Sequence, residues 1–254
     1  MVGGESGDLL LRLLGDTLGD SHSVFRVDGE TRVNATLHQK NPPTQYEIDS
    51  CGPEIPPGVL EDIERCFLSA CGDGFGVLTG SSPPGVPDTH RRRLAEQIRS
   101  QGGKAVVDAH GPVLEEALQA QPYLLRLNRY VLEMYTMRRL ESLEAVAEAA
   151  RELQQRGVGN VCISLGADGA ILAGAANTYH CDAPRMHVQS TVGCGDALLA
   201  GLVSAASQGE DAPSMLQLGV ACGSATAGHP GTELFSFDEI APLQARLQLS
   251  TLDI

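Results

Sequence analysis

The 254-residue sequence is poor in basic residues, with 18 Lys and Arg against 32 Asp and Glu and a formal net charge of −14. Nucleic acids and anionic membranes are bound by clustered Lys and Arg side chains, so the composition argues against both kinds of partner. A small phosphorylated ligand needs only a local group of donors. The one compact basic run, Arg91-Arg92-Arg93, falls within an expected helix, where we expect a solvated helix face.

Long apolar runs and paired cysteine motifs are also missing. No stretch reaches membrane-spanning length, and the N-terminus has neither a basic region nor a signal-like apolar core. The seven cysteines include no Cys-x-x-Cys pair, and no histidines flank them in a zinc pattern. We therefore expect reduced thiols in a cytoplasmic protein without a membrane partner.

Helical and strand-like segments alternate from about residue 56 onward. Strands are expected at 75–79, 104–108, 123–127 and 161–165, with a hairpin partner at 170–173. Helices are expected at 88–101, 112–119, 142–155, 195–207 and 214–227. This alternation predicts an α/β protein whose parallel sheet is covered on both faces. The loops after Thr79, Asp108, Leu127 and Leu165 then share one edge, where ligands collect in such sheets.

The N-terminal part has a different pattern. Residues 5–18 read as a helix with its leucines on one side, namely Leu9, Leu10, Leu13, Leu14 and Leu18. Residues 23–50 suggest short strands around a turn at Asp28-Gly29, and Pro56-Pro57 suits the entry to the next helix. No repeat or linker divides the chain, so we expect one domain over residues 1–254.

The most informative motif is Gly193-Cys194-Gly195-Asp196, placed directly before an apolar helix. Without bulky side chains, backbone N–H groups there can converge on an anion, and the helix dipole adds positive potential. Asp196 would stay ionised in the first turn and could take a proton from a sugar hydroxyl. Taken alone, so short a glycine motif favours the plainer interpretation, in which Asp196 is only a dipole-favoured carboxylate after a glycine turn.

The stretch Thr191–Asp196 resembles the second signature of the PfkB carbohydrate kinases, with Cys194 where alanine is usual. Further segments resemble the 1-phosphofructokinase and tagatose-6-phosphate kinase branch in the same order: 29–34, 52–55, 80–87, 164–170 and 221–225. The similarity covers almost the whole chain. It implies a ribokinase-like three-layer α/β/α sandwich with a small β lid, formed here by about residues 23–50, and ATP-dependent phosphorylation of a sugar phosphate.

The resemblance also implies roles for individual residues. Asp196 matches the catalytic base, and the amides of Gly193, Cys194 and Gly195 match the anion hole. The positions that hold the phosphate already on the sugar are matched by Arg32 and Ser81, with Asn34 on the same strand face as Arg32. Nucleotide-side positions are matched by Arg126, Asn128, Ser164, Gly166 and Gly169, with Gly223 and Ser224 near the adenine pocket.

Two departures from the family pattern stand out. The family's N-terminal strands, its substrate-binding aspartate and its Gly-Gly-Lys-Gly-x-Asn motif are expected to precede residue 1. Gly102-Gly103-Lys104 is no substitute, because it falls at an expected helix end. The family uses Mg²⁺ with ATP, but Val131 stands where an acidic residue is usual, and an aliphatic side chain cannot order a hydrated cation. His110 reads as a loop histidine rather than a catalyst.

Three hypotheses follow from these patterns. The first is an ATP-dependent kinase for a ketohexose phosphate, such as fructose 1-phosphate or tagatose 6-phosphate. The second is a truncated homologue, weakened or inactive, that binds nucleotide or only dimerises through its lid. The third is a kinase for an unphosphorylated sugar or nucleoside. Arg32 and the loop of residues 80–85 favour the first over the third, whereas Val131 and the missing front end favour the second.

Overall fold

The computed structural model describes residues 1–15, 22–111 and 113–254, which form two compact units. The first unit comprises Met1–Ala70 and Ser81–His90, and the second comprises Cys71–Gly80 and Arg91–Ile254. The first unit contains α1 (Gly4–Leu14), β1 (Ala35–Lys40), β2 (Pro43–Ile48) and all but the last residue of α2 (Pro57–Cys71).

The second unit contains a seven-stranded sheet and most of the helices. Its strands are β3 (Phe75–Leu78), β4 (Lys104–Asp108), β5 (Leu124–Asn128), β6 (Asn160–Ser164), β7 (Ala170–Ala173), β8 (Thr178–Cys181) and β9 (Leu249–Leu252). Its helices are α3 (His90–Ser100), α4 (Val113–Gln119), α5 (Arg129–Thr136), α6 (Leu143–Gln155), α7 (Cys194–Ser207), α8 (Ala212–Ala227) and α9 (Ile240–Gln244).

The strand order in this sheet is the sequence order, β3 to β9. Strands β3, β4, β5 and β6 are parallel, and β7, β8 and β9 add antiparallel pairs, so five of the seven strands run in one direction. The expected α/β class, mostly parallel sheet and hairpin partner after β6 are confirmed. Because parallel strands end at the same edge, Asp108 pairs with Arg126 in register, and Asn128 pairs with Ser164.

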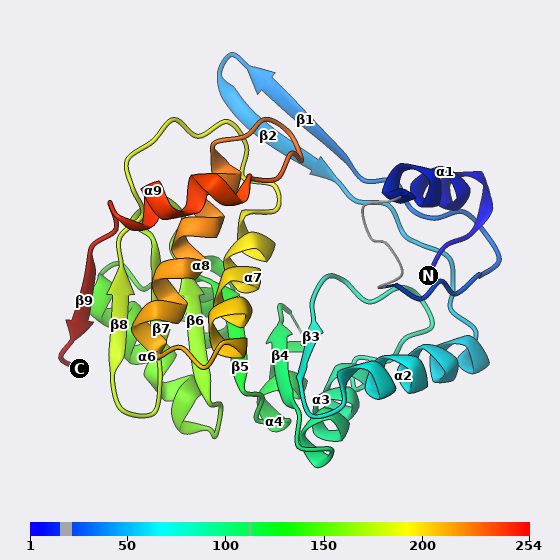
Figure 1. The fold of residues 1–254 in the computed structure, drawn as a ribbon, viewed down its shortest axis with the longest axis horizontal. Helices are drawn as coiled ribbons and strands as arrows, with labels where there is room; N and C mark the ends of the chain where they lie inside the picture. Colours follow the sequence, from blue (N-terminus) through cyan, green and yellow to red (C-terminus); the bar gives the residue numbers. More distant parts are fainter. Residues whose placement is uncertain (16–21, 112) are drawn as a thin grey trace. The chain divides into compact units, whose positions relative to one another are not determined.

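Helices α7 and α8 lie in front of the sheet in Figure 1, and α6 lies behind it. The core between α7, α8 and the sheet is built from side chains of β4, β5, β6 and β7, including Val106, Leu124, Cys162 and Leu172. The two helices approach closely, since a Cβ at Gly201 would lie 2.8 Å from the Gly219 Cα. This tight packing fixes α7, and with it the first turn that carries the glycine motif.

The first unit differs from the sequence-based expectation in two places. Helix α1 ends at Leu14, residues 16–18 of the expected helix lie outside the described residues, and Leu9 and Leu13 on its leucine side are exposed. Asp28-Gly29 is not the hairpin turn, because β1 and β2 are joined at Asn41-Pro42. The alternating apolar residues before position 34 favoured a turn at Asp28-Gly29, although the Asn-Pro pair is the stronger turn signal.

The second unit also needs two corrections. The apolar run of residues 75–79 predicts a buried strand, but Val77 is exposed, and β3 is the edge of the described sheet and pairs only with β4. The run Arg91-Arg92-Arg93 is not simply a solvated face, because Arg91 is buried with 7% of its surface exposed. Helical periodicity turns the first of three consecutive residues inward while its neighbours remain at the surface. The segment Gly102-Gly103-Lys104 ends α3 and begins β4 as expected.

Candidate active site

Asp196 lies in the first turn of α7, as the sequence predicts. Its side chain is exposed and lines a largely apolar depression of about 490 Å³, which β3 and α7 form within the second unit. The Thr79 hydroxyl donates to Asp196 Oδ1 over 3.4 Å. Thr79 was not expected to have this role, although its place at the end of β3 was the available signal. The carboxylate is therefore open to a ligand and is held near the helix N-terminus.

The glycine turn before Asp196 has the backbone that an anion site needs. Gly193 caps α7 in the left-handed region, with φ of 78°. The first N–H groups of a helix lack partners within the helix. The Cys194 amide was expected to bind the anion, but it donates to the Thr191 carbonyl oxygen over 3.4 Å. The amides of Gly195 and Asp196 are therefore better placed to donate to an anion. Burial raises the pKa of the Cys194 thiol, which keeps it protonated.

Arg126 lies directly against this turn. An ideal Cβ at Gly195 would be 2.4 Å from Arg126 Nη2 and 2.7 Å from Nη1, so any larger residue there would displace the guanidinium group from this position. Arg126 Nη1 contacts Asp108 Oδ2 at 3.1 Å, and Nη2 donates to Ser164 Oγ over 2.9 Å. The ends of β4, β5 and β6 thus hold one cation beside the anion-binding turn. The expected common edge of the sheet brings these residues together.

Arg91 fixes the same edge from α3. Its Nη1 donates to the Asp108 carbonyl oxygen over 2.8 Å, and its Nη2 donates to the Gly80 carbonyl oxygen. Burial lowers the pKa of the Arg91 guanidinium, and the nearby Asp108 charge opposes that shift. Arginine keeps its charge in proteins. Arg91 therefore ties the end of β4 to Gly80 in the loop after β3, a role that composition alone did not reveal.

The remaining nucleotide-side residues are placed by turns and helix packing. Gly166 begins the short 3-10 turn between β6 and β7 and Gly169 follows it, and a Cβ at Gly169 would lie 1.9 Å from the Cys181 carbonyl oxygen. Gly223 lies in α8, where a Cβ would be 3.1 Å from the Cys194 carbonyl oxygen. Ser224 is buried in the same helix. Close packing explains why glycine stands at positions 169 and 223. That these residues contact a nucleotide stays a prediction.

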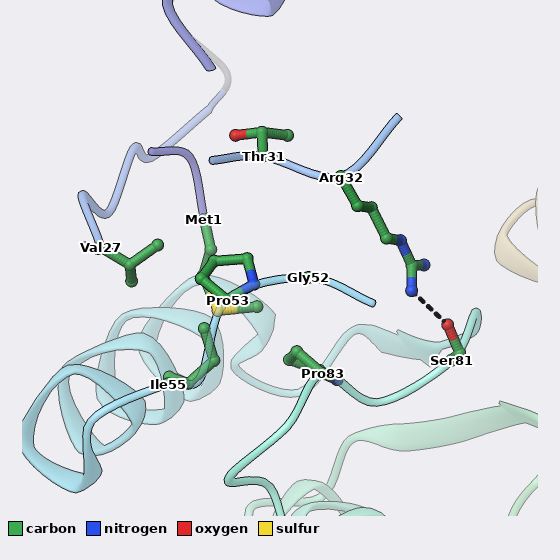
Figure 2. A pocket seen from close by; sticks show the side chains of 9 residues that line it. All are labelled: Met1, Val27, Thr31, Arg32, Gly52, Pro53, Ile55, Ser81 and Pro83. Atoms are coloured by element: carbon green, nitrogen blue, oxygen red, sulfur yellow. Dashed lines mark hydrogen bonds between the residues drawn. The ribbon is translucent and has the colours of Figure 1, made fainter. Parts of the chain in front are cut away.

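The first unit contains a separate cavity of about 170 Å³, shown in Figure 2. Arg32 Nη1 donates to Ser81 Oγ over 2.7 Å at this cavity, so the two residues expected to hold a sugar phosphate are adjacent. Asn34 does not line the cavity, and its Oδ1 accepts from the Ser50 amide over 3.1 Å. Drug-sized ligands occupy roughly 300–1,000 Å³, so this cavity suits a terminal group rather than a whole sugar phosphate.

The residues present do not fit a dedicated magnesium site. Asn128 caps α5, and its Oδ1 accepts from the Val131 amide over 2.8 Å. Glu133, further along α5, accepts from the Leu140 amide and pairs with Arg129. In the described ranges, no group of three or more His, Cys, Asp or Glu side chains could hold a metal ion. His110 is exposed in the loop after β4.

Within the described residues, every helix is too short or too polar to cross a bilayer.

Comparisons with known proteins agree with this architecture. The 1-phosphofructokinase of Rhodobacter capsulatus is 31% identical over 254 residues, which cover 99% of this chain and 80% of that protein. The structure of Escherichia coli phosphofructokinase-2 with substrates and products is 28% identical with a TM-score of 0.86, covering 96% and 80% of the two chains. Its tetrameric inhibited form matches with 28% identity and a TM-score of 0.83, covering 96% and 79%.

The match to a family profile covers most of the chain as well. Residues 61–239 match the pfkB family carbohydrate kinases, and this range contains the glycine turn, Asp196 and the Arg126 cluster. The chain therefore belongs to the pfkB family of carbohydrate kinases.

Proposed function

We propose that the chain transfers the γ-phosphoryl group of ATP to a hydroxyl of a ketohexose phosphate. Fructose 1-phosphate, which would give fructose 1,6-bisphosphate, and tagatose 6-phosphate are the two candidate substrates. The observation that carries the proposal is the exposed Asp196 carboxylate in the first turn of α7, beside the glycine turn and the Arg126 guanidinium. This arrangement offers a base and anion donors at neighbouring positions, which is what phosphoryl transfer asks of a protein.

In the proposed reaction, Asp196 accepts the proton of the attacking hydroxyl group. The hydroxyl oxygen forms a bond to the γ-phosphorus as the bond from that phosphorus to the bridging oxygen breaks, and the electron pair leaves with ADP. Amides at the start of α7 and the Arg126 N–H groups stabilise the charge on the transferred group. Ser164 acts through Arg126, to which it is hydrogen-bonded.

The phosphate already present on the sugar is assigned to Arg32 and Ser81. Arginine presents a planar set of donors that suits a phosphate group. The Ser81 hydroxyl lies within hydrogen-bond distance of the Arg32 guanidinium, so both side chains can donate to the same phosphate. The cavity beside them matches a terminal group in size. This pairing favours a phosphorylated sugar over a free sugar or a nucleoside.

Replacing Arg32 tests the assignment of the sugar phosphate. We expect Arg32→Met to raise the KM for fructose 1-phosphate by roughly 10- to 100-fold, because a charge-assisted contact is lost. The KM for ATP should change little. Initial rates from a coupled ADP assay with fructose 1-phosphate, tagatose 6-phosphate and fructose give both values. Arg26→Met, which removes an exposed partner of Asp8, is the matched control. An unchanged KM for every sugar phosphate would reject the assignment of Arg32.

A second candidate function is a homologue that binds nucleotide without transferring phosphate. Val131 in place of an acidic residue, and the use of Asn128 as a helix cap, favour it. The same assay separates the two candidates, because a binding-only homologue would hold ATP and produce no ADP that depends on sugar.

We also propose that the β1–β2 hairpin serves as a dimer contact between two copies of the chain. Leu37 pairs with Tyr46 and Ala35 pairs with Ile48, so these side chains share one face of the hairpin. Leu37, Tyr46 and Ile48 are 55%, 51% and 53% exposed. The opposite face carries Thr36, Gln45 and Glu47. A second copy of the same apolar face would remove these side chains from water.

A charge on the apolar face should break such a dimer. We expect Tyr46→Glu to shift the chain toward monomer in light scattering coupled to gel filtration, because an unpaired carboxylate would be buried at the contact. Gln45→Glu adds the same charge on the opposite face and should leave the assembly unchanged. Equal masses for both variants and the wild type would contradict the hairpin contact.

A further inference from the structure

We propose that Arg126 is the built-in cation of the phosphate site, so that the chain binds the phosphates of ATP without needing a divalent metal ion. This inference rests on the proposed function, because it concerns how the same glycine turn binds nucleotide. It begins from the disagreement between the residues present and a magnesium site, described above for Asn128, Val131 and Glu133.

The position of the guanidinium group is the first support. Two of its nitrogen atoms lie within 2.7 Å of the place where a Gly195 Cβ would be, so the group covers the start of α7 directly. Contacts to Asp108 and Ser164 hold it there, and the Arg126 and Asp108 side chains are only 14% and 17% exposed. A cation fixed in this way loses little conformational entropy when an anion arrives.

Unused hydrogen-bonding capacity is the second support. The contacts to Asp108 and Ser164 each occupy one terminal nitrogen of Arg126, and each such nitrogen carries two N–H groups. Arg126 Nε is buried and has no hydrogen-bond partner within the described part of the chain. The free N–H groups of the two terminal nitrogens are therefore the donors that Arg126 can offer to a phosphate, and Nε remains a further unused donor.

The local charge is the third support. Arg126 pairs with the Asp108 carboxylate, and Arg91 donates to the Asp108 carbonyl oxygen, so two guanidinium groups lie at this edge of the sheet. These two cations offset the carboxylates of Asp108 and Asp196, and the N-terminal end of α7 then favours the approach of an anionic phosphate. The carboxylate of Asp108 is already paired with Arg126, which leaves it poorly available to a divalent cation. A fixed guanidinium can therefore supply charge that a metal ion otherwise provides.

Binding of ATP measured by calorimetry in excess EDTA and in excess Mg²⁺ tests this inference. We expect the wild-type Kd to differ by less than about tenfold between the two conditions, and Arg126→Met to weaken binding in EDTA by about tenfold or more. Arg126→Lys keeps the charge and should recover part of the affinity. Arg138→Met, which removes an exposed partner of Glu152 elsewhere in the unit, is the matched control and should bind as the wild type does.

The outcomes separate this inference from the proposed function. Two outcomes overturn the role of Arg126 and leave the kinase proposal standing. In the first, the wild type binds ATP only when Mg²⁺ is present; in the second, Arg126→Met binds ATP in EDTA with the same affinity as the wild type. An absence of ATP binding in both conditions overturns both. The wild-type comparison needs no substitution, so a folding defect in a variant cannot obscure it.

Discussion

Asp196→Asn should lower the rate of sugar-dependent ADP formation by roughly a hundredfold or more, because it removes the proposed base while keeping the side-chain size. The amide accepts no proton from the attacking hydroxyl group at neutral pH. The affinity for ATP should stay close to that of the wild type, since the first-turn amides and Arg126 do not depend on this carboxylate for their positions. Initial rates at saturating ATP and sugar phosphate measure the effect.

The control for this substitution is Asp182→Asn, which neutralises another exposed carboxylate in the same unit. It should leave the rate unchanged within a small factor. Equal rates for Asp196→Asn and the wild type would remove Asp196 as the base, even if both proteins bind ATP.

Arg91→Met should lower the free energy of unfolding by about 2–4 kcal/mol. The substitution leaves two carbonyl groups without the hydrogen bonds that Arg91 donates to them, and it removes a buried charge near Asp108. For a chain of this size, the midpoint of thermal unfolding should fall by roughly 5–15 °C. Methionine has a similar length, so the loss reflects the missing hydrogen bonds more than an empty cavity. Thermal unfolding followed by circular dichroism gives the midpoint.

Arg92→Met provides the matched comparison one residue along α3. Its side chain is 35% exposed and pairs with Glu116 near the surface, so the loss should be within about 1 kcal/mol. If both variants unfold at the same temperature, Arg91 does not stabilise the edge of the sheet in the way described.

Much of the second unit could be predicted from sequence because its hydrophobic periodicity is regular. The stripe of α6, with Val146, Ala147, Ala150 and Leu153, is buried as its spacing predicts. Alternating strands and helices also predicted that the ends of β4, β5 and β6 share an edge, and that edge brings Asp108, Arg126 and Ser164 into contact.

Other features depend on long-range packing that a single sequence does not encode locally. The burial of Arg91 requires one carbonyl group at the end of β4 and one in the loop after β3, and neither is visible in the pattern of α3. The exposure of Val77 depends on the place of β3 at the edge of the described sheet rather than on its apolar residues. The role of Asn128 as a helix cap became clear only from its contact with the Val131 amide.

Phosphorus NMR of the wild-type chain with ATP and fructose 1-phosphate tests the central claim most directly. The account predicts a new phosphomonoester signal from fructose 1,6-bisphosphate, matched by ADP and strongly reduced with Asp196→Asn. Release of inorganic phosphate without a sugar product, or equal product from the wild type and Asp196→Asn, would contradict it.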